Sequence, residues 1–115
     1  MASTTPQQLV TIQLGATVAS AYAVATNRRL IITKITLLNT TGTDRTVDLH
    51  LVPSGGSADA TNQILDAKVM EANMTEPYIV TGAMQHVLNG GGAIHAGADA
   101  ATAVTMVVSG VLVVV

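Results

Sequence analysis

The feature that most constrains this sequence is an alternation of apolar and polar residues with a period of two, interrupted by turn-forming residues. A strand presents each of its faces at every second residue, so the pattern predicts strands with one face against a core. Residues 30–39 place Ile31, Thr33, Ile35 and Leu37 on one face. Residues 45–52 place Val47, Leu49 and Leu51 inward, with Thr46, Asp48 and His50 outward.

The remaining strand candidates are residues 8–14, 17–26, 68–72, 78–81, 83–88, 93–96 and 102–115. We interpret the two segments on either side of Gly82 as one bent strand, which gives about eight strands. Asn27-Arg28-Arg29 is predicted to form a turn. Asp59 to Ala67 is the one helix candidate, because Asp59 suits an N-cap and Ile64 and Leu65 suit core contacts. Short strands with frequent turns are typical of an antiparallel sandwich or barrel.

Composition limits the classes of function. The chain has 115 residues, which is enough for one domain. Its net charge is −2, so it lacks the basic surface that a nucleic-acid-binding protein needs. Without cysteine it has no disulfide and no thiolate chemistry. The most apolar stretch, residues 103–115, is shorter than the roughly 20 residues that span a bilayer. The first residues lack the features of a signal peptide, so we expect neither secretion nor a membrane anchor.

The fraction of charged residues is unusually low. It is 10%, whereas globular domains average about 25%. Either a neutral, threonine-rich β surface faces the solvent, or neighbouring subunits cover much of the exterior. We favour the second interpretation, because a sparsely charged and valine-rich surface is prone to association.

No pattern of catalytic or metal-binding residues stands out. The run Asn89-Gly90-Gly91-Gly92 lacks the lysine of a phosphate loop and reads as a hairpin turn. The three imidazoles, His50, His86 and His95, lack the spacing of a zinc motif, although His86 and His95 flank that turn as potential cross-strand neighbours. No nucleophile elbow surrounds a serine, since Ser54 and Ser57 lie in a glycine-rich loop. We therefore predict no enzymatic activity, no cofactor and no metal.

The strongest candidate for a binding surface is the run Val111, Leu112, Val113, Val114 and Val115, which is apolar on both faces. Such a strand is central or covered, because left exposed it is a template for aggregation. Either the N-terminal arm of the chain or another subunit covers it, and we favour another subunit. Four of the five positive charges, Arg28 and Arg29 among them, lie in the first half of the chain. They are either solvated loop charges or part of a docking patch.

Several segments resemble one group of proteins. They are Lys34 to Gly42, Val47 to Gly56, Val87 to Gly91, Ile94 to Ala96 and Ala103 to Val111. Their order of hydrophobic runs and turns, over about residues 30–111, is similar to that of small jelly-roll virion proteins of tailed bacteriophages. The group includes capsid cement or decoration proteins and tail or fibre components. The resemblance implies an antiparallel jelly roll without enzymatic activity, commonly a trimer.

Together these observations predict an all-β protein: an antiparallel, jelly-roll-like β-sandwich of about eight strands with one short inserted helix. Residues 1–8 form an N-terminal arm and residues 9–115 a single domain. We expect a capsid cement protein on the exterior of the virion, made in the host cytoplasm. Its partners would be itself, as a homotrimer, and the major capsid protein. The alternatives are a tail, baseplate or fibre component, and a carbohydrate-binding module that uses Tyr22 and Tyr78.

Overall fold

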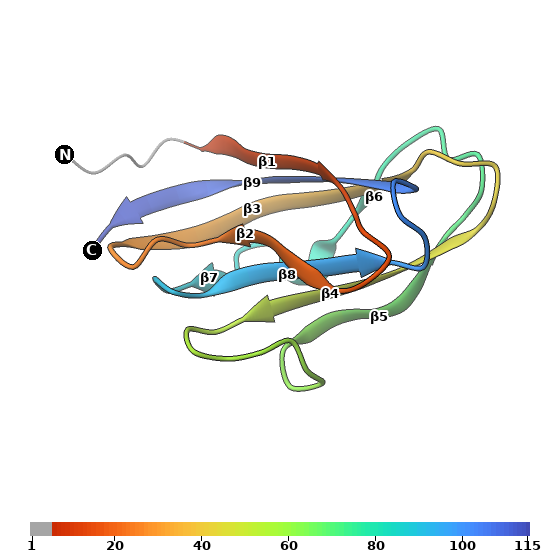
Figure 1. Ribbon diagram of the computed structural model, residues 1–115. Coiled ribbons are helices and arrows are strands. Elements are labelled where there is room, and N and C mark those ends of the chain that lie inside the picture. Colours follow the sequence, from red (N-terminus) through yellow and green to blue (C-terminus); the bar gives the residue numbers. More distant parts are fainter. Residues whose placement is uncertain (1–5) are drawn as a thin grey trace.

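The computed structural model describes residues 6–115, which form two antiparallel sheets packed face to face (Figure 1). Within that range there are nine strands: β1 (Gln7–Gln13), β2 (Ala19–Ala23), β3 (Arg28–Asn39), β4 (Arg45–Val52), β5 (Gln63–Met70), β6 (Tyr78–Ile79), β7 (Val87–Leu88), β8 (Ala93–Ala98) and β9 (Val104–Val114). A 3-10 turn, η1 (Thr81–Ala83), separates β6 from β7. This turn explains why the strand predicted to bend at Gly82 is two strands, which raises the count from about eight to nine.

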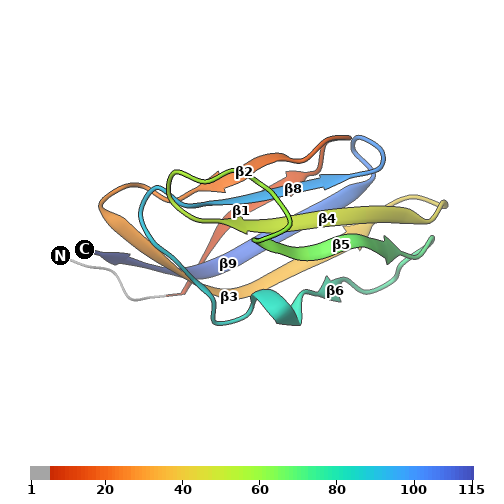
Figure 2. The ribbon, with the colours of Figure 1, turned by 90° about the horizontal axis from the view of Figure 1, so that it is seen from below.

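The order of the strands is that of a jelly roll. One sheet runs β1-β9-β3-β6, with β7 also paired to β3, and the other runs β2-β8-β4-β5. Figure 2 shows β2, β8, β4 and β5 side by side across the layer that contains β1, β9 and β3. When β6 and β7 are taken as two halves of one interrupted strand, two nested Greek keys result. The predicted antiparallel sandwich is confirmed.

The helix predicted for Asp59 to Ala67 is wrong. Asp59 caps a tight turn instead, because its Oδ1 accepts hydrogen bonds from the backbone N–H of Thr61 at 2.9 Å and from the Thr61 hydroxyl. The chain then enters β5, where Leu65 lies opposite Leu49 of β4. The short strand predicted at residues 68–72 is the end of this longer strand.

A β-bulge changes the faces predicted for β3. In β3 the register shifts between Ile32 and Lys34, so Leu30 and Ile32 are buried rather than Ile31 and Thr33. Downstream of the bulge Ile35 and Leu37 are buried, so the four residues predicted to share one face do not share it. A bulge inserts one residue and reverses the phase of the alternation, which a strict period of two does not reveal.

Strand β4 keeps its alternation, because it pairs with β8 without a register shift, and His50 lies on its outer face as predicted. His50 is nevertheless only 6% exposed, because the loop before β5 covers it and brings the carbonyl oxygen of Asp59 and Asn62 Oδ1 to its ring. Leu51, predicted inward, is half-buried. The prediction for Val47 and Leu49 is confirmed, since both are buried.

The core between the sheets is aliphatic, as the near absence of aromatic residues predicts. Its largest fully buried side chains include Leu30, Ile32, Ile35, Leu37, Leu49, Ile94 and Met106. Asn39 and His50 are the buried polar residues within the described part of the chain. Of the predicted N-terminal arm, Gln7 and Gln8 belong to β1, and residues 1–5 lie outside the described residues.

Candidate functional site

The predicted interface residues come together at one end of the sandwich. Strands β3 and β9 pair so that Arg28 lies opposite Val114 and Arg29 opposite Val113, which places both arginines in a strand rather than in the predicted turn. The backbone N–H of Val115 donates to the carbonyl of Asn27 at 3.1 Å. We call Val111–Val115 together with Arg28 and Arg29 the β9 end.

The β9 end is only partly covered by the rest of the described chain. Upstream, β9 is a central strand between β1 and β3, but its pairing with β1 reaches only to Gly110, opposite Gln7. Beyond Gly110 its described partner is β3 alone. Leu112 packs against the core, while Val114 and Val115 are 41% and 61% exposed. Apolar surface therefore remains accessible where the sequence predicts a binding surface.

The two arginines at the β9 end have no acidic partner among residues 6–115. Arg28 Nη1 donates to the carbonyl of Asn27 at 3.3 Å, and Arg29 Nε donates to Asn89 Oδ1 at 3.1 Å. The ion pair that the described residues do form, between Arg45 and Asp99 at 4.0 Å, involves neither of them. Their charge is thus free to meet an acidic group on another molecule.

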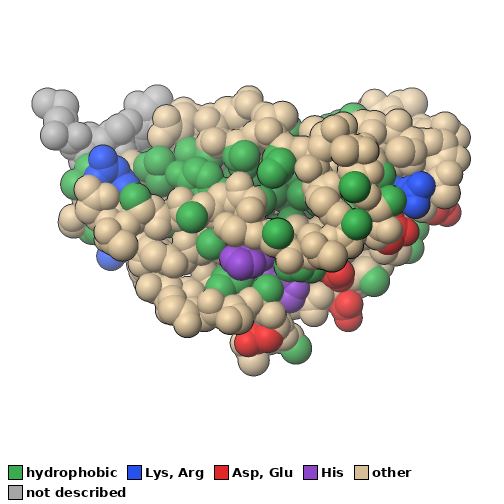
Figure 3. All heavy atoms as spheres, viewed as in Figure 1, with side chains coloured by type: hydrophobic (Ala, Val, Ile, Leu, Met, Phe, Trp, Pro, Cys, Tyr) green, Lys and Arg blue, Asp and Glu red, His purple; other side chains and the backbone are tan. Residues whose placement is uncertain are grey.

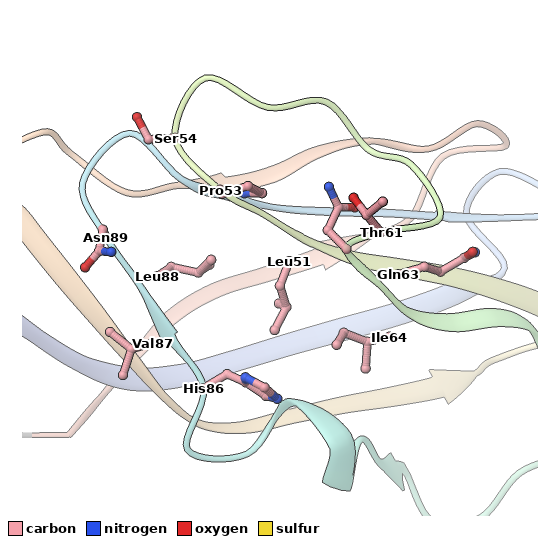
Figure 4. A pocket seen from close by; sticks show the side chains of 11 residues that line it. Leu51, Pro53, Ser54, Thr61, Gln63, Ile64, His86, Val87, Leu88 and Asn89 are labelled. Atoms are coloured by element: carbon pink, nitrogen blue, oxygen red, sulfur yellow. The ribbon is translucent and has the colours of Figure 1, made fainter.

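A second feature is an open groove of about 580 Å³ between β5 and β7 (Figure 4). The side chains of Leu51, Ile64 and Leu88 point toward one another across it, and His86 lies along one side. Its polar lining comes from hydroxyl, amide and imidazole groups, and no carboxylate, lysine or arginine takes part. Ser54 and His86 both line the groove, but without a carboxylate it does not assemble a catalytic triad or a pair of acids.

The histidines lie in different surroundings. His50 Nδ1 lies 3.0 Å from the carbonyl oxygen of Asp59 and 2.9 Å from Asn62 Oδ1, so it fixes the loop before β5. His95 lies opposite His50 on β8, so His86 and His95 are not the cross-strand neighbours that the sequence allowed. Within residues 6–115 no three His, Cys, Asp or Glu side chains converge as metal ligands.

The glycine run forms the predicted tight turn between β7 and β8. Gly91 has a φ of 88°, and its N–H donates to the carbonyl of Val24 at 2.9 Å. A Cβ at Gly91 would lie 2.4 Å from Ser54 Oγ, so the glycine permits a close approach of two loops. Backbone conformation and packing account for this residue without a phosphate ligand.

The two tyrosines do not form a common platform for a sugar. Tyr22 is on β2 and Tyr78 on β6, in different sheets and on opposite sides of the sandwich. The ammonium of Lys68 lies 5.0 Å from the centre of the Tyr78 ring. Among the described residues no helix has the length and apolar character needed to cross a bilayer. No protein family, no curated protein and no solved structure matches this chain.

Sequence reasoning did not identify the groove or the burial of His50. Both depend on segments that meet only in the fold: the loop before β5 covers His50, and residues 61–64 and 86–89 line the groove together. The β9 end carries a local signal, five consecutive apolar residues in a chain that otherwise alternates, and for that reason it was accessible from the sequence.

Proposed function

We propose that the chain is a structural virion protein, a capsid cement protein that binds its neighbours through the β9 end. The observation that carries this proposal is the exposed apolar strand terminus beside two arginines without acidic partners among the described residues. A jelly roll supports the proposal only as an architecture, since one fold serves many functions. The resemblance of the sequence to virion proteins of tailed bacteriophages is the reason for proposing a phage capsid as the assembly to which the subunit belongs.

The mechanism is one of added contacts. Each subunit buries apolar surface that is exposed in the free chain, and these contacts exist only in the assembled shell. A ligand that binds only the assembled state stabilises that state by mass action. In the trimer that we propose, heterologous contacts between copies close into a ring, and the β9 end of each copy docks on the shell. Arg28 and Arg29 attract acidic groups on the neighbouring molecule and set the orientation in which the subunit docks.

The size of the effect follows from the exposure of the terminal residues. Burying a whole valine side chain contributes about 1.5–3 kcal/mol, and Val115 is 61% exposed. Covering it therefore contributes about 1–2 kcal/mol, and a loss of 1.4 kcal/mol weakens binding about tenfold. Substituting one terminal valine is thus enough to be measured.

The experiment compares Val115→Ser with Val69→Ser in binding to undecorated shells assembled from a phage major capsid protein. Val69 is a matched control, because it is also an exposed valine, 52% accessible, on the remote strand β5. We expect wild type and Val69→Ser to sediment with the shells, Val115→Ser about tenfold more weakly, and a chain lacking Val111–Val115 not at all. Equal binding by all four proteins, or no binding by wild type, contradicts the proposal.

A further inference from the structure

The outer strands of the two sheets differ in how they are protected from pairing with another chain. Strand β5 carries Asp66 and Lys68, and between them Ala67 has a left-handed φ of 48° that distorts the edge. Strands β6 and β7 are two residues each and are interrupted by η1. Charges, bulges and short edge strands are the devices by which proteins prevent strand addition. This side of the sandwich is protected.

Strands β1 and β2, the other two outer strands, lack most of these devices. Neither contains a proline, and no Lys, Arg, Asp or Glu occurs anywhere from Gln7 to Asn27. Each has one register shift, but β1 pairs regularly with β9 from Val10 to Gln13. No strand within residues 6–115 pairs with the outer edge of either. Two uncharged edges are thus open to pairing.

The two open edges lie on the same side of the molecule and form one surface. Figure 1 shows β1 and β2 together in front, and Figure 3, in the same view, shows apolar side chains across the upper middle of this face. The Lys, Arg, Asp and Glu side chains lie toward its ends and its lower border. The half-buried apolar side chains of these strands are Leu9, Val10, Ile12, Ala21 and Tyr22. We call β1 and β2 with these side chains the neutral edge.

We propose that the neutral edge is the surface through which a second copy of this chain binds. A surface without ions can face its own copy without opposing like charges and without removing an unpaired ion from water. It offers nothing to attract a highly charged partner. Because β1 is an edge strand, it pairs with an edge strand of the second copy, and the backbone hydrogen bonds then continue from one subunit to the next. Apolar side chains beside the pair lose contact with water at the same time.

The test places like charges on the neutral edge. Thr11 and Gln13 are exposed on β1, and the double variant Thr11→Lys/Gln13→Lys introduces two lysines there. The matched control is Thr81→Lys/Gln85→Lys, which changes the same residue types at exposed positions on the opposite side. Lysines on adjoining strands of two subunits repel each other and oppose strand addition.

Light scattering gives the mass of each protein. We expect a multiple of 11.7 kDa for wild type and for the control, and 11.7 kDa for the Thr11→Lys/Gln13→Lys variant. A single-chain mass for wild type overturns the inference, and so does an assembled mass for the edge variant. Circular dichroism of the edge variant verifies that its β structure is retained.

Hydrogen exchange on the wild-type chain provides a test that needs no variant. When the protein is diluted until its copies dissociate, we expect the backbone amides of β1 and β2 to lose protection from exchange. Those of the central strands β8 and β9 should keep theirs. Protection of β1 and β2 that does not change on dissociation overturns the inference. Protection that appears only when shells are added assigns the neutral edge to the shell protein, and also overturns it. The inference does not rest on the proposed function, whose test is the binding of shells through the β9 end.

Discussion

Replacing Asn39 by alanine would remove a link between the two sheets. Asn39 ends β3 and is 1% exposed. Its Nδ2 donates to the carbonyl oxygens of Thr43, Met70 and Glu71, at 2.7, 3.0 and 3.2 Å. Met70 is the last residue of β5, in the opposite sheet, and Oδ1 of the same amide accepts the N–H of Thr41 at 3.0 Å. One side chain therefore joins the end of β3, the loop that follows it and the end of β5.

The expected cost can be worked out from these bonds. A buried polar group left without its partner costs about 1–3 kcal/mol. The bond to Met70 is fully buried, and those to Thr43 and Glu71 are partly buried, so we count one full and two partial losses. Asn39→Ala should lower the free energy of unfolding by about 3 kcal/mol. For a domain near 100 residues this corresponds to a fall of about 12 °C or more in Tm.

Urea unfolding of wild type, Asn39→Ala and Asn89→Ala measures this effect. Asn89 is the control, because it is exposed and its side chain only accepts a hydrogen bond from Arg29. We expect the control to lie within about 0.5 kcal/mol of wild type. If Asn39→Ala lies equally close to wild type with an unchanged denaturant dependence, the argument that this amide ties the sheets together is refuted.

Three further predictions concern single positions. Gly91→Ala should lower stability by about 1–3 kcal/mol in urea, because of the positive φ and the contact with Ser54. Hydrogen bonds from Thr61 lower the pKa of Asp59, so its ionised form stabilises the fold above the pKa of the unfolded state, and that contribution is lost as pH falls through the folded-state pKa. When the free energy of unfolding is measured at decreasing pH, it should therefore fall less steeply for Asp59→Asn than for wild type. Leu112→Ala should lower the free energy of unfolding of the free chain by about 1 kcal/mol, because Leu112 is only half-buried and a fully buried leucine is worth about 2–5 kcal/mol. The same substitution should lower the free energy of binding to shells by more than this amount.

The strands of this protein were predictable because their hydrophobic pattern is local. The alternation in residues 30–39 and 45–52 marks β3 and β4, and Pro53 and the residues that follow it mark the end of β4. The clustering of the terminal valines also predicted where apolar surface remains exposed. Whether that surface is an interface stays a prediction, which the experiments above address.

The features that sequence reasoning missed depend on distant partners. Asp59 followed by Ile64 and Leu65 satisfies a helix N-cap and a tight turn equally well, and only the ladder to β4 selects the strand. The bulge in β3 lies opposite Gly110, where a Cβ would meet the carbonyl oxygen of Ile31 at 2.6 Å. That close approach joins positions far apart in the chain, and neither segment reveals it alone.

The positions of β8 and β9 have a consequence for how the protein forms in the cell. Each is flanked on both sides in its sheet, β8 by β2 and β4 and β9 by β1 and β3. Both follow the other seven described strands in the sequence, so until β8 and β9 emerge from the ribosome only the β4–β5 hairpin and the short pairs of β3 with β6 and β7 have their partners. A nascent chain must therefore hold β1 and β2 unpaired until β8 and β9 have emerged. Such long-range closure is intrinsically slow, and stalled or truncated products expose both strands to aggregation.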